Sequence, residues 1–298
     1  MSFKNDFKIN NGVVYSNNLI RSMWQMTATN IKIFDMAVSC LDTRTRTKDQ
    51  RTVSVSKRDI IALMNVSKAS GRSTAFKEQI QSIQNAKILI AKNDAMTKFD
   101  SVVLVPKISW GTKDDDDEVL IQFHEDVMPF LVELRDNFVH IKLEEMRGLH
   151  GKYALILHRL LVSNFKEKRA HYIGLPYNKK KGMTFIIEVK ELRRITDTLK
   201  EYSLFADFEK WVIKKAVDEI NHAFTSIVIK YDKIKAGRAI QEIRFHVRER
   251  LSTYDNDFDK PIEMKGYYHE SNYDDLEIAD EQLNTHEQTS LMFGDLEI

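Results

Sequence analysis

Apolar residues between positions 205 and 223 recur at the three- and four-residue spacing of a single helix face. They are Phe205, Phe208, Trp211, Val212, Ala216, Ile220 and Ala223. The spacing then changes to alternation at 227–231 and again at 243–247, which predicts two strands. The turn predicted between them, at 232–238, carries three cations, and Gly237 within it is free to adopt a positive φ. The pattern therefore predicts a long helix that leads into a hairpin with a basic turn.

A helix with an exposed basic face followed by a cationic hairpin is typical of a winged helix. In that fold the helix fills the major groove of DNA while the hairpin, or wing, touches the phosphate backbone. An ordinary surface helix and hairpin would give the same local pattern. A strand at 185–189 and a short helix at 190–196 precede the long helix, which completes the order strand, short helix, long helix, hairpin.

The same order occurs in the first half of the chain, after a helix at 27–41 that Thr27 or Thr29 would cap. A strand at 53–55 is followed by a short helix at 60–64, a helix at 74–87 and a hairpin formed by 88–90 and 102–105. Val55 corresponds to Val189 and Phe76 to Phe208, at separations of 134 and 132 residues, and the run 36–41 matches 160–165. The sequence therefore predicts an α+β fold of two tandem winged helices related by internal duplication.

Charge divides the chain more clearly than its formal net charge of +1 indicates. Residues 252–298 carry a net charge of −11, and the preceding 251 residues carry +12. A basic body favours a polyanionic partner, and an acidic segment without hydrophobic periodicity favours disorder. We predict a first winged helix at 1–134, a second at 135–251 that is the main DNA reader, and a disordered acidic tail at 252–298.

The residues needed for several other functions are missing from the sequence. Cys40 is the only cysteine, so no intramolecular disulfide or cysteine cluster can form, and a reducing cytoplasm is expected. The N-terminus lacks the apolar segment of a signal peptide, and no apolar run approaches the roughly 20 residues that span a bilayer. There is no metal-binding pair of histidines around one hydrophobic residue and no Gly-rich ATP-binding loop. We therefore expect no enzyme activity, no metal and no cofactor.

Four runs of residues resemble one family of proteins when taken in order. They are Val14-Tyr15-Ser16-Asn17-Asn18-Leu19-Ile20, the stretch from Lys152 to Leu161, Ala216-Val217-Asp218-Glu219-Ile220-Asn221, and Lys235-Ala236-Gly237-Arg238. Together they resemble iteron-binding plasmid replication initiators, or Rep proteins, with two winged helices, a family that includes the F-plasmid initiator. The resemblance covers about residues 13–250. It implies a bacterial protein that binds direct repeats at a plasmid origin, opens a neighbouring A+T-rich segment and recruits host replication proteins.

The resemblance also assigns roles to residues. In the second domain, Lys210, Lys214 and Lys215 would read the major groove, and Lys233, Lys235 and Arg238 of the wing would hold phosphates. In the first domain, Lys68, Ser70, Arg72, Ser73 and Lys77 surround a helix N-terminus, which suits phosphate contacts. The double-stranded DNA of the repeats is thus the expected partner of the monomer. A dimer joined through the first domain is expected to repress its own gene.

The tail contains one further motif. Gln288-Thr289-Ser290-Leu291-Met292-Phe293 resembles the peptide that bacterial proteins insert into the pocket of the replicative sliding clamp. Leu291 and Phe293 would be its apolar anchors, with Gln288 as its first residue. Six residues of so loose a pattern also occur by chance.

Two other functions fit the same fold. A dimeric winged-helix repressor would bind an operator and never open DNA, and a protein-interaction scaffold would bind no DNA. The basic body argues against the scaffold, whereas only DNA opening or replication would separate an initiator from a repressor.

Overall fold

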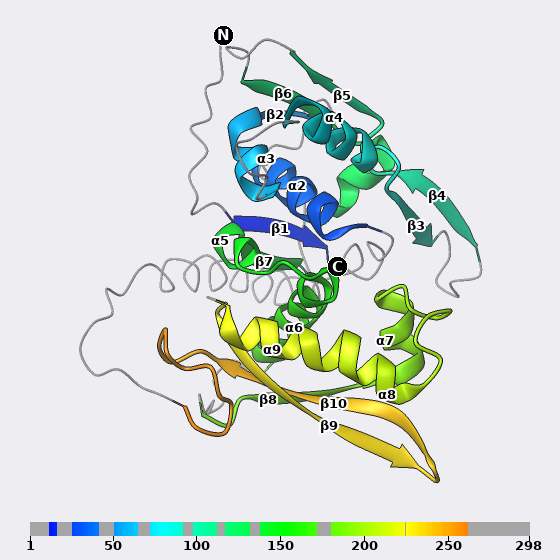
Figure 1. Ribbon diagram of the computed structural model, residues 1–298, viewed down its shortest axis with the longest axis vertical. Helices are drawn as coiled ribbons and strands as arrows, with labels where there is room; N and C mark the ends of the chain where they lie inside the picture. The colour runs from blue at the N-terminus through cyan, green and yellow to red at the C-terminus, as the bar shows by residue number, and fades with distance from the viewer. Residues whose placement is uncertain are drawn as a thin grey trace, which may run out of the picture. The chain divides into compact units, whose positions relative to one another are not determined.

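The computed structural model describes residues 12–16, 26–41, 51–64, 72–91, 98–111, 117–131, 138–171, 180–223 and 225–261 (Figure 1). Helices and strands alternate along these residues in a mixed α+β arrangement. In chain order they are β1 (Gly12–Ser16), α2 (Ala28–Ser39), β2 (Thr52–Ser56), α3 (Lys57–Met64), α4 (Arg72–Ile83), β3 (Lys87–Ala91), β4 (Phe99–Val103), β5 (Lys107–Trp110), β6 (Glu118–Gln122), the 3₁₀ helix η2 (Glu125–Phe130), β7 (Phe138–Lys142), α5 (Leu143–Arg147), α6 (Lys152–His171), β8 (Met183–Glu188), α7 (Val189–Ile195), α8 (Phe205–Phe208), the π-helical η3 (Glu209–Lys214), α9 (Lys215–His222), β9 (Ile227–Ala236) and β10 (Ala239–Glu249).

The second domain has the predicted order of elements and a single three-stranded antiparallel sheet, β8–β10–β9. Ile243, Phe245 and Val247 of the central strand β10 are fully buried, as alternation along a half-buried strand requires. Figure 1 shows the helix formed by α8, η3 and α9 alongside this sheet. Gly182, just before β8, has a φ of 64°, and a Cβ there would lie 2.1 Å from the carbonyl oxygen of Val247. Only glycine fits where β8 enters the sheet.

The first domain keeps the same order of helices but divides its strands β2 to β6 between two sheets. The predicted hairpin is confirmed, since Ile88 pairs with Val102 in the β3–β4 ladder, but its second strand is Phe99–Val103 and not 102–105. Strand β2, however, pairs with β6 in the sheet β2–β6–β5 and not with the hairpin. Pro106, which has no N–H to donate, separates β4 from β5. The chain can then turn back, and β5 pairs with β6 instead.

The two copies meet through corresponding elements. Strand β1, which precedes α2, pairs antiparallel with β7, which precedes α5 and α6, and Tyr15 lies opposite Val139. The helices α2 and α6 are joined by a buried ion pair in which Arg159 donates to Asp35, 124 residues away in sequence. Tyr15 and Val139 have the same separation, and so do the matched runs 36–41 and 160–165. Such contacts between equivalent positions are expected where two copies pack about an approximate twofold axis.

The prediction of a disordered tail was wrong for residues 252–261. Arg248 of β10 and Asp255 are both fully buried, and the guanidinium of Arg248 donates to the two carboxylate oxygens of Asp255 at 2.5 and 2.7 Å. Arg250 donates to the backbone carbonyl oxygen of Asp255, and the ring of Phe258 covers Arg248 with 5.3 Å between ring centroid and guanidinium carbon. Paired arginines thus fix this acidic segment against the sheet. Residues 262–298, including Gln288, Leu291 and Phe293, lie outside the described residues.

Candidate nucleic-acid interface

The predicted reading helix runs without a break from Phe205 to His222, but its middle turn, η3, is π-helical. Its buried side chains are Phe208, Val212, Ile213, Ala216, Val217 and Ile220. The sequence pattern placed Trp211 on this face, and that was wrong because Trp211 is 45% exposed. Ile213 and Val217 are buried in its place, so the inner face is centred away from Trp211. A π turn holds one residue more than an α turn and shifts the phase of a helix in this way.

The outer face of this helix carries all three of its predicted DNA-binding residues. Lys210, Lys214 and Lys215 are exposed, together with Trp211 between them. The ammonium nitrogen of Lys210 lies 4.7 Å from the centroid of the Trp211 ring, in the range of a cation–π contact. The structure therefore brings these three cations together on one surface that solvent can reach.

Arg193 of α7 fixes the point at which the reading helix begins. Its guanidinium donates to the carbonyl oxygens of Thr198 at 3.3 Å, Glu201 at 2.9 Å and Tyr202 at 2.7 Å, and its carbon lies 4.2 Å from the ring centroid of Phe208. Burial lowers the pKa of this arginine, but a guanidinium stays charged at neutral pH. The role of Arg193 could not be predicted from the sequence, because no local pattern shows that a cation on a short helix will bind three carbonyls.

The wing is longer than predicted, and its turn is shorter. Ala236 pairs with Ala239, so only Gly237 and Arg238 form the turn, with Gly237 at a φ of 63° as expected. The prediction that Lys233 and Lys235 lie in the turn was wrong, since both lie on β9. Cross-strand pairing continues almost to the tip, which keeps the wing extended. Lys235 and Arg238 are exposed near that tip.

Lys233 has a different environment from the other two wing cations. Its ammonium group lies 3.0 Å from a carboxylate oxygen of Glu209, the first residue of η3. The hydroxyl of Tyr231 donates to the same carboxylate at 3.0 Å, and burial followed by this hydrogen bond raises the pKa of Tyr231. Glu209 thereby joins the base of the wing to the reading helix. The charge of Lys233 is therefore balanced by Glu209. Lys235 and Arg238 form no ion pair with any residue in the described ranges.

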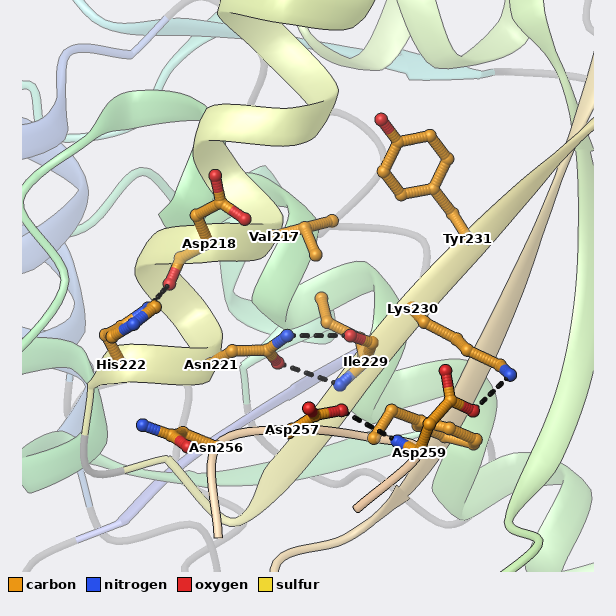
Figure 2. A pocket seen from close by; sticks show the side chains of 11 residues that line it. Val217, Asp218, Asn221, His222, Ile229, Lys230, Tyr231, Asn256, Asp257 and Asp259 are labelled. Atoms are coloured by element: carbon orange, nitrogen blue, oxygen red, sulfur yellow. Dashed lines mark hydrogen bonds and ion pairs between the residues drawn. The ribbon is translucent and has the colours of Figure 1, made fainter. Parts of the chain in front are cut away.

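A groove of about 460 Å³ lies at the far end of the reading helix, between α9, β9 and residues 256–259 (Figure 2). Its lining includes the carboxylates of Asp218, Asp257 and Asp259, of which Asp259 pairs with Lys230 at 2.5 Å. Asn221 is held in place by both backbone groups of Ile229. Carboxylates repel phosphate, so the acidic lining makes this groove less suited to the DNA backbone than the exposed lysines of the helix.

The first-domain residues of the prediction are described only in part. Lys68 and Ser70 lie outside the described residues, and Arg72 and Ser73 begin α4 with side chains that are not described. Lys77 is exposed on α4, whose other face buries Phe76, Ile80 and Ile83 as predicted.

Polar contacts fix α4 on α2. The amide group of Gln79 donates to the side-chain oxygen of Asn30 at 2.8 Å, and the hydroxyl of Ser82 donates to the same oxygen at 2.9 Å. The N-cap of α2 is Thr27, one of the two predicted candidates, whose hydroxyl accepts from the N–H of Asn30 at 3.2 Å. These contacts place Lys77 on a fixed helix.

Two features are absent from the residues that the structure describes. No group of three or more His, Cys, Asp or Glu side chains there is arranged to hold a metal ion. No helix in the described ranges has the length and apolar character needed to cross a membrane.

Both domains match models of known protein families. Residues 12–162 match the family described as Initiator Replication protein, WH1, and residues 188–247 match Initiator Rep protein, WH2. No curated protein matches the sequence. The crystal structure of Pi initiator protein in complex with iteron DNA is similar over 82% of this chain and 99% of that chain, with a TM-score of 0.66 and 19% identity. Domains 2 and 3 of RctB align over 76% of this chain and 81% of theirs, with a TM-score of 0.39 and 11% identity.

At these identities the likeness to the Pi initiator shows a shared fold. The two family matches go further, because one covers the first winged helix and the other covers the reading helix and wing of the second. The predicted fold of two tandem winged helices is confirmed, and the chain belongs to the Rep family of replication initiator proteins.

Proposed function

We propose that this protein initiates plasmid replication by binding iterons, the direct repeats of an origin, as double-stranded DNA. Binding opens a neighbouring A+T-rich segment and recruits host replication proteins in a bacterial cytoplasm. The protein acts through binding and not through catalysis, in keeping with the absence from its sequence of a histidine pair or an ATP-binding loop.

One observation carries this proposal. In a chain that belongs to the initiator family, the reading helix and the wing tip of the second domain expose cations on the elements that a winged helix presents to DNA. The Pi initiator, which has the same fold, is described in complex with iteron DNA. Lys210, Lys214 and Lys215 on the helix suit the major groove and its rim, while Lys235 and Arg238 suit the backbone beyond it.

The first domain supplies a second reader in the same chain. Lys77 is exposed on α4, the helix that corresponds to the reading helix of the second domain. Two readers in one polypeptide let a monomer occupy a repeat longer than a single major-groove contact, without the twofold symmetry that a dimer imposes on its site.

A footprint of the purified full chain on the few hundred base pairs around its own gene tests the proposal. Several evenly spaced direct repeats should be protected. Protection of one inverted repeat over the promoter and nowhere else would instead favour a dedicated repressor, and no protection at moderate salt would favour a protein scaffold. A dimer joined through the first domain would add an inverted repeat to the protected direct repeats, as autorepression requires.

Recruitment of the sliding clamp through Gln288, Leu291 and Phe293 belongs to the same proposal. Deleting residues 286–298 should leave the footprint intact and abolish capture of purified clamp, because two apolar anchors would supply most of the binding energy. Capture that survives the deletion would show that this motif does not bind the clamp.

A further inference from the structure

The reading helix exposes one large apolar side chain that the fold does not use. Trp211 is 45% exposed, whereas Phe208, one turn earlier, is fully buried. A tryptophan left in water forgoes the gain from burying its ring, so a stable domain would normally place it inside. Trp211 stands instead on the face that carries the reading cations, which indicates that something apolar meets it there.

The local backbone produces this exposure. The π turn at Glu209–Lys214 contains Trp211 and shifts the helix so that Ile213 and Val217 face the core. π turns inside α-helices are frequent at functional sites, where the extra residue gives a side chain a new direction. Other side chains fill the buried face of the helix, so Trp211 is not needed there and is available to contact a ligand.

The surroundings of Trp211 hold it in place. Lys210 lies over the ring with its ammonium nitrogen 4.7 Å from the centroid. Glu209, the preceding residue, is tied to the wing through Tyr231 and Lys233, each at 3.0 Å. The pair Lys210–Trp211 therefore sits in the turn of the helix that is anchored to the wing, and Lys214 and Lys215 follow one turn later on the same exposed face.

We propose that Trp211 reads the 5-methyl group of a thymine on the floor of the major groove. This inference rests on the proposed function and adds to it one determinant of sequence specificity. The thymine methyl is the apolar group that the major groove displays, and apolar side chains recognise it by contact. Lys210, held against the ring, remains next to the phosphates at the rim, so one element combines an apolar reader with a charge that positions it.

The test uses the full chain and the repeat that footprinting defines. Duplexes are prepared in which single thymines are replaced by deoxyuridine, which removes only the methyl group. Wild-type protein should lose about fourfold in affinity at one particular thymine, the value of burying roughly one methyl group. Trp211→Ala should bind the unmodified repeat more weakly and should no longer distinguish thymine from deoxyuridine at that position.

Controls separate this contact from a general effect. Tyr254 is an aromatic residue 63% exposed outside the helix, so Tyr254→Ala should keep the full discrimination. Trp211→Ala should leave the salt dependence of binding unchanged, because no phosphate contact is removed. Its melting temperature should fall only slightly, since Trp211 is 45% exposed and lies outside the core.

Three results would overturn the proposal. They are a wild-type protein that is insensitive to every deoxyuridine exchange, a Trp211→Ala variant that keeps the sensitivity, and a Trp211→Ala variant whose salt dependence shows the loss of a phosphate contact. All three require that the wild-type protein binds the repeats. Failure to bind any direct repeat would reject the proposed function itself and is seen separately in the footprint.

Discussion

The two winged helices share an order of elements but differ in how firmly each hairpin is attached to its helix. In the second domain, β9 and β10 are 10 and 11 residues long and form one sheet with β8. In the first domain, β3 and β4 have five residues each and form a sheet of their own. A two-stranded sheet has little stability alone and depends on what it packs against. The wing of the second domain is thus the more rigid of the two.

Polar anchors strengthen this difference. Arg193 holds the start of the second reading helix, and Glu209 ties its middle to the wing. In the first domain the described anchors, Asn30 with Gln79 and Ser82, join α4 to the preceding helix α2 and not to the hairpin. The two domains thus share an order of helices but differ in how their strands pair. This difference supports the second domain as the main reader of DNA.

Breaking the ion pair that joins the two copies should have the largest effect. Arg159→Met would leave the carboxylate of Asp35 buried without its cation, at a cost of about 3–5 kcal/mol in the free energy of unfolding. Urea denaturation at pH 9, where Asp35 of the wild type is ionised, would measure this loss. The double variant Asp35→Leu/Arg159→Met should recover most of it, because replacing both charges by apolar groups removes the desolvation penalty.

The loss of unfolding free energy in Arg159→Met should also depend on pH, in a direction that follows from the pKa of Asp35. Burial raises the pKa of Asp35 to about 7, from its ordinary value of 3.8, and Arg159 offsets only part of that rise. A carboxyl with a raised pKa in the folded state favours folding while it is protonated and loses that contribution as the pH rises. Wild-type Asp35 ionises beside Arg159 only above about pH 7, so the loss caused by Arg159→Met should be largest at pH 9 and should shrink as the pH falls to 6. A loss that is equal at both pH values would mean that Asp35 is not the group left uncompensated.

Removing cations from the two reading helices should have the next largest effect. It should also show which domain contributes more to DNA binding. Lys214→Ala combined with Lys215→Ala should weaken repeat binding by about tenfold or more, since each side chain contributes a charge-assisted contact. Lys77→Ala should weaken it by less if the first domain is the secondary reader. Lys107→Ala, an exposed lysine on β5 outside the predicted interface, is the matched control and should bind as the wild type does. Titration of a labelled repeat at fixed salt would measure all three, and a larger effect from Lys77→Ala would reverse the order of the readers.

The helices and the second sheet could be predicted from the sequence because their signals are local. Periodicity of apolar residues located α2, α4 and the reading helix, and Gly237 marked the wing turn. Pairing between distant strands carries no such signal. The partner of β2 is β6, far along the chain, and only the folded structure decides it over the nearer hairpin.

The candidate site was predicted only in part for a similar reason. Positive charge on the reading helix and wing was visible, but whether each cation is available depends on tertiary contacts. Lys233 proved to be paired with Glu209, Trp211 proved to be exposed, and Arg193 proved to position the helix. Composition likewise assigned residues 252–261 to the tail, because it could not show that Asp255 would meet Arg248.

The smallest expected effects concern single cations of the wing, and they test whether its rigid geometry reaches the DNA backbone. Lys235→Ala and Arg238→Ala should each reduce the slope of log affinity against log salt by about 0.9, the value for one lost phosphate contact. Lys233→Ala should leave the slope nearly unchanged, because Glu209 already balances that ammonium group. Measuring the affinity of each variant at several salt concentrations shows which of these three side chains contacts a phosphate. Equal slopes for Lys233→Ala and Lys235→Ala would show that Lys233 leaves Glu209 when DNA binds, and the base of the wing would then be part of the interface.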